Sequence, residues 1–151
     1  MNIALSYECT YAPRSEFLRL LTFALGETQH LSELKKITIL DSENGSVSEG
    51  SAHPDEVTVW VHDPLVSCYP QATQYLPELM PTFILRSWEE EVLLTLAHEL
   101  RHVEQFWLQP EVECDADFHS PQSQMMELDA ETFGQSVVLK WRGMLKIKQA
   151  A

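Results

Sequence analysis

The chain of 151 residues is long enough for one domain with a buried core, and its 44% hydrophobic and 22% charged composition is unlike that of a disordered or fibrous protein. A formal net charge of −13 would repel phosphate backbones, so we exclude nucleic acid as a partner. Three widely spaced cysteines do not make a disulfide framework, and no signal-like or membrane-length apolar segment occurs. We therefore expect a soluble cytoplasmic protein that does not contact membranes.

The first half of the chain predicts one helix and a small sheet. Residues 14–25 place apolar side chains at helical spacing, and Gly26 follows as a common helix end. Short apolar segments with β-branched residues then predict strands at residues 36–40, 56–62 and 82–86. The two stretches between these strands, residues 41–55 and 63–81, are rich in Ser, Gly, Asn or Pro and are expected to be loops.

The second half predicts two long helices. Ser87 and Glu90 form a capping box, so a helix is expected to begin at Trp88. Ser120 followed by a proline marks the start of the last helix, whose apolar residues recur in steps of three and four through most of residues 121–148. We therefore predict a single α+β domain over residues 1–151, with an early helix and a small twisted three-stranded sheet packed on two long helices.

The first of these two helices carries the sequence His98-Glu99-Leu100-Arg101-His102, an HExxH pattern. Residues four apart lie on one face of a helix, so the imidazoles of His98 and His102 can converge on one metal ion. The carboxylate of Glu99 lies beside them and can take a proton from a water molecule activated by the metal. This spacing predicts a zinc site with Glu99 as general base.

The pattern alone is suggestive, because its letters would arise by accident in roughly 3 of 100 chains of this composition. The alternative is a pair of core histidines with satisfied hydrogen bonds. However, the pattern falls in the middle of a capped and strongly apolar helix, where two imidazoles and a carboxylate would be costly to bury without a metal. The context therefore favours metal binding.

A catalytic zinc needs a third protein ligand and one open position. The last helix contains Glu127-Leu128-Asp129-Ala130-Glu131, in which the two glutamates face one side. We predict Glu127 as the third ligand and Glu131 as a residue that orients a ligand histidine. The alternative for Glu127 is an ordinary solvated carboxylate, and the ligand would then come from one of the other acidic or imidazole side chains nearby: Asp115, Asp117, His119 or Glu131.

HExxH followed by a later helix with this glutamate motif resembles the gluzincin zinc peptidases, and the chain's size and layout resemble the minigluzincins, which include phage-repressor-cleaving and stress-response metallopeptidases of bacteria. The likeness in letters covers residues 96–106 and 127–134, and Arg101 stands where many members carry Gly. A metzincin would instead need Gly and His or Asp where this chain has Gln105 and Leu108. The resemblance implies a zincin-like fold with one Zn²⁺ per chain.

The resemblance also implies a hydrolase of peptide bonds, acting on a peptide or protein substrate. We expect an extended peptide to pair with an exposed sheet edge. Such enzymes usually supply a side chain that stabilises the oxyanion, and the candidates here are His119, Tyr69 and Tyr75. Nothing in the chain suggests an exopeptidase motif, which favours an endopeptidase. The alternative from another class is a catalytically quiet zinc-binding module that regulates or recruits other proteins.

Overall fold

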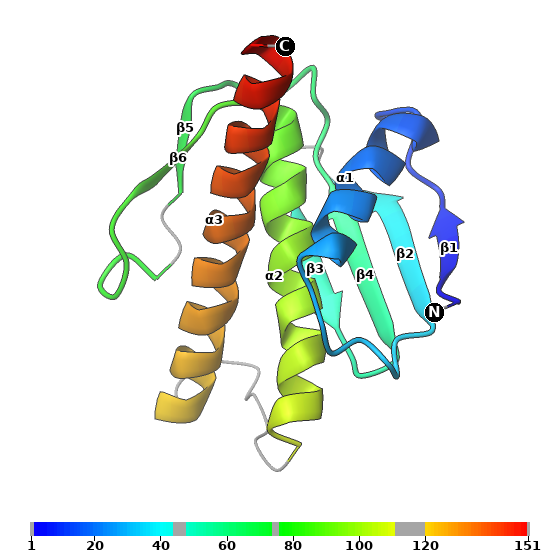
Figure 1. Ribbon diagram of the computed structural model, residues 1–151, viewed down its shortest axis with the longest axis vertical. Coiled ribbons are helices and arrows are strands. Elements are labelled where there is room, and N and C mark those ends of the chain that lie inside the picture. Colours follow the sequence, from blue (N-terminus) through cyan, green and yellow to red (C-terminus); the bar gives the residue numbers. More distant parts are fainter. Residues whose placement is uncertain (1, 44–47, 74–75, 111–119, 151) are drawn as a thin grey trace.

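We describe the computed structural model of the chain for residues 2–43, 48–73, 76–110 and 120–150. Within these ranges it is an α+β structure with three helices, a four-stranded sheet and a separate two-stranded ribbon (Figure 1). The elements in chain order are β1 (Ala4–Tyr7), α1 (Arg14–Gly26), β2 (Lys36–Asp41), β3 (Glu49–Ala52), β4 (Glu56–Val61), β5 (Gln71–Thr73), β6 (Phe83–Leu85), α2 (Trp88–Leu108) and α3 (Pro121–Ala150). None of the described helices has the length and apolar character needed to cross a membrane.

The main sheet has the strand order β1-β2-β4-β3, in which β1, β2 and β4 are parallel and β3 is antiparallel to β4. The centre of the sheet follows from the alternation in β4, where Val57, Val59 and Val61 are fully buried and the residues between them are half-buried. β3 precedes β4 in an antiparallel hairpin and forms the edge of the sheet, with Gly50 opposite Val59.

The expected three-stranded sheet is corrected by the structure. The segment 82–86 does form a strand, β6, but it pairs with β5 in a ribbon apart from the main sheet. β1, β3 and β5 lie outside the predicted strands, and the expected loops 41–55 and 63–81 contain β3 and β5. The sequence of β3, Glu-Gly-Ser-Ala, has no β-branched residue, so the strand depends on its pairing with β4 and not on local propensity.

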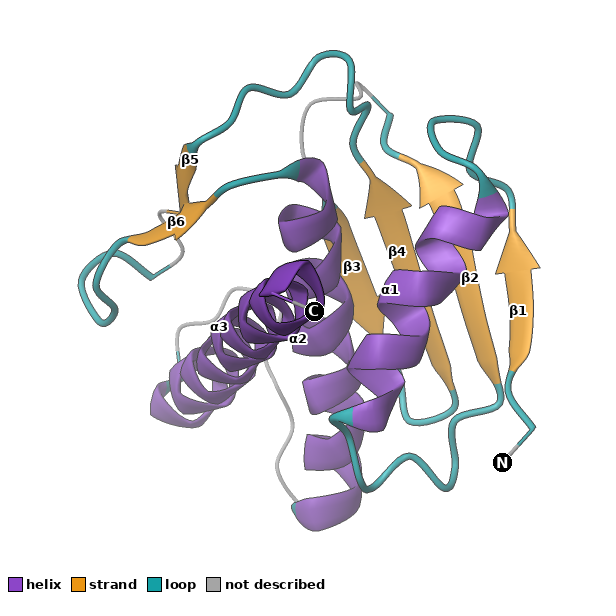
Figure 2. Cartoon of the chain, turned by 45° about the horizontal axis from the view of Figure 1, so that its top comes forward, coloured by secondary structure: helices purple, strands orange, loops and turns teal. Residues whose placement is uncertain are grey.

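α1 and α2 lie on one face of the main sheet, and α3 packs along α2 on the side away from the sheet (Figure 2). α2 is therefore enclosed from both sides, and Val92, Leu93, Leu96, Ala97 and Leu100 are fully buried. This helix begins at Trp88 as predicted, with the Ser87 hydroxyl accepting a hydrogen bond from the Glu90 amide at 3.3 Å.

α2 and α3 approach each other closely at Gly134 of α3. A Cβ atom at this position would lie 2.8 Å from Cδ1 and 3.0 Å from the carbonyl oxygen of Leu94, so the contact requires glycine. Near the other end of the helix pair, Arg142 of α3 donates hydrogen bonds of 2.6 and 2.9 Å to the Glu90 carboxylate and one of 2.5 Å to the carbonyl of Ile84. These contacts hold α3 at a defined depth along α2, which places its glutamates opposite the histidines of α2.

Candidate metal centre

The two histidines of the HExxH pattern point at the same carboxylate. Nε2 of His98 lies 3.1 Å from Oε2 of Glu127, and Nε2 of His102 lies 3.0 Å from Oε1 of the same residue. The two Nε2 atoms are 3.1 Å apart. One nitrogen from each ring and one carboxylate oxygen lie within 4.8 Å of one another, so this group could hold a metal ion.

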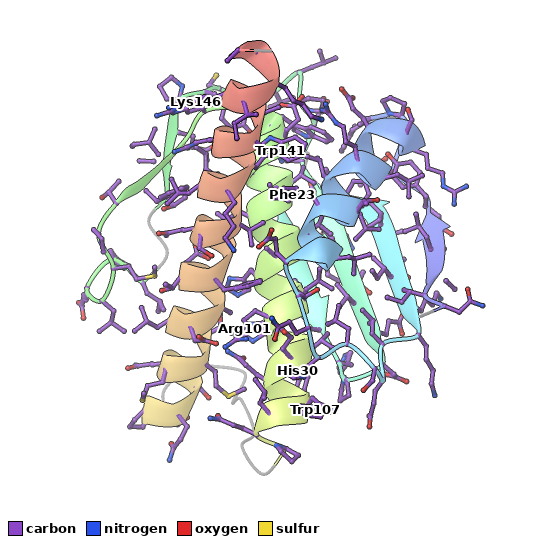
Figure 3. All side chains as sticks on the ribbon, in the orientation of Figure 1. Phe23, His30, Arg101, Trp107, Trp141 and Lys146 are labelled. Atoms are coloured by element: carbon purple, nitrogen blue, oxygen red, sulfur yellow. The ribbon has the colours of Figure 1, made fainter. Side chains whose placement is uncertain are left out.

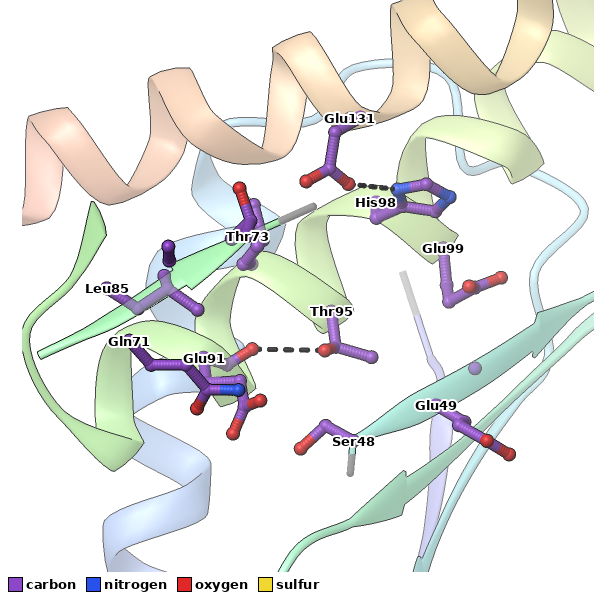
Figure 4. A pocket seen from close by; sticks show the side chains of 13 residues that line it. Ser48, Glu49, Gln71, Thr73, Leu85, Glu91, Thr95, His98, Glu99 and Glu131 are labelled. Atoms are coloured by element: carbon purple, nitrogen blue, oxygen red, sulfur yellow. Dashed lines mark hydrogen bonds and ion pairs between the residues drawn. The ribbon is translucent and has the colours of Figure 1, made fainter. Parts of the chain in front are cut away.

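The far side of each imidazole is held by a second residue. Nδ1 of His98 is 3.0 Å from Oε2 of Glu131 on α3, as the dashed line in Figure 4 shows, and Nδ1 of His102 is 2.8 Å from Oε1 of Gln105. Gln105 is itself held, because its amide nitrogen donates to Met126 O and to Asp129 Oδ2 at 2.9 and 2.8 Å. With a metal on Nε2, each ring would carry its hydrogen on Nδ1, where Glu131 and Gln105 are placed to accept it.

The spacing and chemistry of these donors suit a small divalent cation. Ligand atoms about 2.0 to 2.1 Å from a tetrahedral metal are about 3.3 to 3.4 Å apart. The two Nε2 atoms are 3.1 Å apart, and together with one Glu127 oxygen they lie within 4.8 Å of one another. His98, Glu127 and Glu131 are all buried. Burial works to lower the pKa of His98, but hydrogen bonds to Glu127 and Glu131 outweigh it and raise the pKa to about 10. The site therefore stabilises positive charge at the point where the three ligand atoms meet.

Arg101, the residue before His102, lies between α2 and α3 (Figure 3). Its guanidinium donates to Asp129 at 2.8 Å and to Glu104 at 3.2 Å, and it lies over the ring of Phe133 with 5.6 Å between Cζ and the ring centre. Asp129 also accepts from Gln105. Arg101 thus braces the helix that bears Glu127 against the helix that bears the histidines.

Glu99 faces the other side of α2, toward β3. Its side chain is 8% exposed, makes no hydrogen bond with any described residue, and lies against the backbone of Gly50, where a Cβ atom would be 2.3 Å from Cγ and 2.5 Å from Oε1 of Glu99. Burial raises the pKa of Glu99 above its ordinary value, while the neighbouring histidines act in the opposite direction. A buried carboxylate with free oxygens next to a metal-binding group is suited to accept a proton.

Glu99 and His98 line a cavity of about 500 Å³ between α2, β3 and the β5–β6 ribbon. Figure 4 shows this cavity with the side chains that surround it. The lining residues are Ser48, Glu49 and Gly50 at the start of β3; Gln71, Ala72, Thr73 and Leu85 of the ribbon; Glu91, Leu94, Thr95, His98 and Glu99 of α2; and Glu131 of α3. Of the three candidate ligands His98 lines the cavity, and Glu99 lines it beside His98.

Of the three oxyanion candidates, only Tyr69 is among the described residues. Its hydroxyl lies 2.5 Å from Nε2 of His62 and donates to Oε2 of Glu91 at 2.8 Å. Tyr69 is therefore committed to a polar group built around the buried His62, whose Nδ1 is 2.6 Å from the hydroxyl of Ser48. His119 and Tyr75, like the alternative ligands Asp115 and Asp117, lie outside the described residues.

Three residues of this site were not predicted from the sequence. Gln105 carries a detectable signal, because it follows His102 by three residues on the same helix and so lies within reach of its ring. Gly50 has none, since its role is to leave space for a residue that is distant in the chain. The sequence predicts His62 only as the last residue of a strand. Its polar contacts could not be predicted, because its partners come from α2 and from the segments that precede β3 and β5.

Comparison of the chain with protein-family models, with curated proteins and with solved structures finds no match.

Proposed function

We propose that this protein is a zinc-dependent endopeptidase with a zincin-like fold, acting on a peptide or protein substrate in the cytoplasm. The observation that carries the proposal is the convergence of His98, His102 and Glu127, whose ligand atoms lie within 4.8 Å, next to a buried carboxylate without a hydrogen-bond partner among the described residues. A site that served only to hold a metal would gain nothing from that fourth group, Glu99.

The donor set fits one Zn²⁺ per chain. Two imidazole nitrogens and one carboxylate oxygen are the ligands of catalytic zinc sites, and such a set leaves a position open for water or substrate. When bound, zinc lowers the pKa of a water molecule to about 7 and polarises a carbonyl group. The hydrogen bonds of Glu131 and Gln105 to the two rings would increase the basicity of the ligands and preserve their orientation.

Glu99 would carry out the proton transfers. Its carboxylate takes a proton from the attacking water and later delivers it to the amine that leaves. The elevated pKa of Glu99 suits both halves of this task, because a base with a very low pKa would accept the proton poorly. Its contact with Gly50 holds the side chain against β3, where it lines the cavity together with His98.

The substrate would pair with β3. This strand bonds to β4 on one side, and the residues at its start, Ser48 to Gly50, line the cavity on the other. An extended peptide added along β3 would run past Glu99 and bring one carbonyl group to His98 and His102. Such a peptide is held by its backbone along the strand, which suits cleavage within a chain.

Two measurements test the proposal together: metal content by mass spectrometry of protein purified without added metal, and cleavage of a peptide library by the wild type and Glu99→Gln. We expect about one zinc per chain in both proteins and cleavage only by the wild type, since replacing a general base lowers the rate by about 10²- to 10⁴-fold. Zinc bound with equal inactivity in both proteins would contradict the peptidase and support a zinc-binding regulatory module.

A further inference from the structure

We propose that the cavity beside the metal centre binds a cationic side chain of the substrate, a Lys or Arg next to the scissile bond, and that Glu91 is the residue that selects it. This inference rests on the proposed peptidase function. It names the substrate class that the site takes and adds a residue, Glu91, that lies outside the HExxH pattern and the ligand set.

Glu91 is the residue on which the inference depends. It lies in the first turn of α2, is 8% exposed, and lines the cavity. Its Oε2 contacts both the hydroxyl of Tyr69, at 2.8 Å, and Nε2 of His62, at 2.6 Å. Oε1 accepts no hydrogen bond from any residue that the structure describes. Because Glu91 lines the cavity, this oxygen is available to accept a hydrogen bond from a ligand there.

The polar group around His62 fixes the position of the Glu91 carboxylate. Nδ1 of His62 is 2.6 Å from the hydroxyl of Ser48, which also accepts from the backbone amide of His62 at 3.4 Å. Nε2 of the same ring and the hydroxyl of Tyr69 both lie against Oε2 of Glu91. Glu91 is therefore held through one oxygen at the wall of the cavity.

Among the described residues that line the cavity, none is a Lys or Arg that could pair with the Glu91 carboxylate. The lining residues there include the four acids Glu49, Glu91, Glu99 and Glu131. Two of these acids have other partners or roles, because Glu131 holds His98 and Glu99 is placed as the base. Leu85, Leu94 and Ala72 supply an apolar wall. The methylene stem of a Lys or Arg can pack against this wall.

The distance along α2 matches the length of such a side chain. Glu91 precedes His98 by seven residues, which is about 10 Å along the helix axis. An extended arginine side chain reaches about 7 Å from its Cα to its terminal nitrogens, which spans most of that separation. A free α-amino group is only about 2.5 Å from the scissile carbonyl carbon and could not reach Glu91, which distinguishes this site from that of an aminopeptidase.

The first experiment measures cleavage-site preference on a peptide library for the wild type, Glu91→Gln and Glu89→Gln. Glu89→Gln removes the same charge two residues earlier on α2, outside the cavity lining, and is the matched control. We expect the wild type and the control to prefer Lys or Arg on one side of the cleaved bond by about tenfold or more, and Glu91→Gln to lose that preference while it still cleaves uncharged sites. A wild type that prefers uncharged or acidic residues there overturns the inference.

The second experiment does not depend on turnover. Binding of acetyl-arginine amide and of its neutral isostere acetyl-citrulline amide to the protein as purified is followed by chemical-shift titration, with perturbations expected near Glu91 and Thr95. The arginine compound should bind about tenfold more tightly than the citrulline compound, and Glu91→Gln but not Glu89→Gln should abolish the difference. Equal or undetectable binding of both compounds overturns the subsite. Preferential arginine binding in a protein that cleaves nothing would contradict the peptidase and leave the subsite standing.

Discussion

Gly50 of β3 and Glu99 of α2 are in direct contact, and a Cβ atom on Gly50 would lie 2.3 Å from Cγ of Glu99. The position of the proposed base therefore depends on the absence of a side chain in a strand that is distant in sequence. Replacing Gly50 by Ala should push the Glu99 carboxylate away from the metal centre without touching any ligand, and a displacement of about 1 Å is enough to lower kcat/KM by about 10²-fold.

This effect is checked by measuring kcat/KM and zinc content for Gly50→Ala beside Ser51→Ala. Ser51 is the next residue of β3, so its side chain points to the opposite face of the strand. We expect both variants to retain zinc and only Gly50→Ala to lose activity. A Gly50→Ala protein with wild-type kcat/KM would show that Glu99 is not held by this contact.

Glu127 should dominate metal retention among the residues of α3. Both of its carboxylate oxygens lie within 3.1 Å of an imidazole nitrogen, so Glu127→Ala removes the only ligand that α3 supplies within the described group. We expect zinc affinity, measured by competition with a chromogenic chelator, to fall by more than the 10 to 100-fold typical of residues that only support a ligand. If affinity is unchanged, the third ligand comes from elsewhere in the chain.

Gln105 should matter for metal affinity although it cannot reach the ion itself. Its Oε1 accepts from Nδ1 of His102 at 2.8 Å, so Gln105→Leu frees that ring to rotate and leaves its N–H without a partner. The same competition assay should show zinc affinity lower by about 10 to 100-fold. Gln109→Leu, the same substitution at the exposed end of α2, is the control and should bind zinc as the wild type does.

Two glycines of α3 should respond in opposite ways to alanine. Gly134→Ala places a methyl group 2.8 Å from Leu94 Cδ1 and 3.0 Å from a backbone oxygen, which should cost about 1 to 3 kcal/mol in the free energy of unfolding and weaken zinc binding by separating the helices. A methyl group at Gly143 would meet no atom within 4 Å, so Gly143→Ala should stabilise the protein by up to about 1 kcal/mol. Urea denaturation with and without zinc measures both effects.

The ion pair between Glu90 and Arg142 should make stability depend on pH. Burial acts to raise the pKa of Glu90, but hydrogen bonds from Arg142 and from the Arg86 amide outweigh it and hold the pKa below its ordinary 4.5. Because the folded-state pKa is the lower one, the pair contributes its stability above about pH 4.5 and loses it as the pH falls through the folded-state pKa. Glu90→Gln should lower the Tm at pH 7, and its difference from the wild type should narrow toward pH 3. A constant difference would rule out this linkage.

The sequence predicts the helices well because each carries its own signals. The capping box at Ser87 and the Ser-Pro pair at 120–121 both stand at helix starts in the structure, and the HExxH spacing is enough to place His98 and His102 on one face. Glu127 and Glu131 could be predicted in a similar way, because their spacing puts them on one face of α3. To reach the histidines they need only that α3 pack alongside α2.

The sheet and the environment of Glu99 could not be predicted in the same way. β1 and β3 exist through pairing with β2 and β4, and their four-residue sequences have little strand propensity of their own. Gly50 and the group of His62, Ser48 and Glu91 come together through contacts between segments that are far apart along the chain. Such contacts depend on how the helices and strands pack together, so no local sequence pattern predicts them.

The edge position of β3 has a consequence for how separate molecules behave in solution. Unpaired backbone groups on an edge strand are a template for strands of other molecules, and proteins protect such edges with short strands and charged side chains. β3 is four residues long and begins with the exposed Glu49, in a chain whose net charge is −13. Mutual repulsion between copies therefore opposes edge-to-edge aggregation, and the same charge would favour strands from positively charged polypeptides.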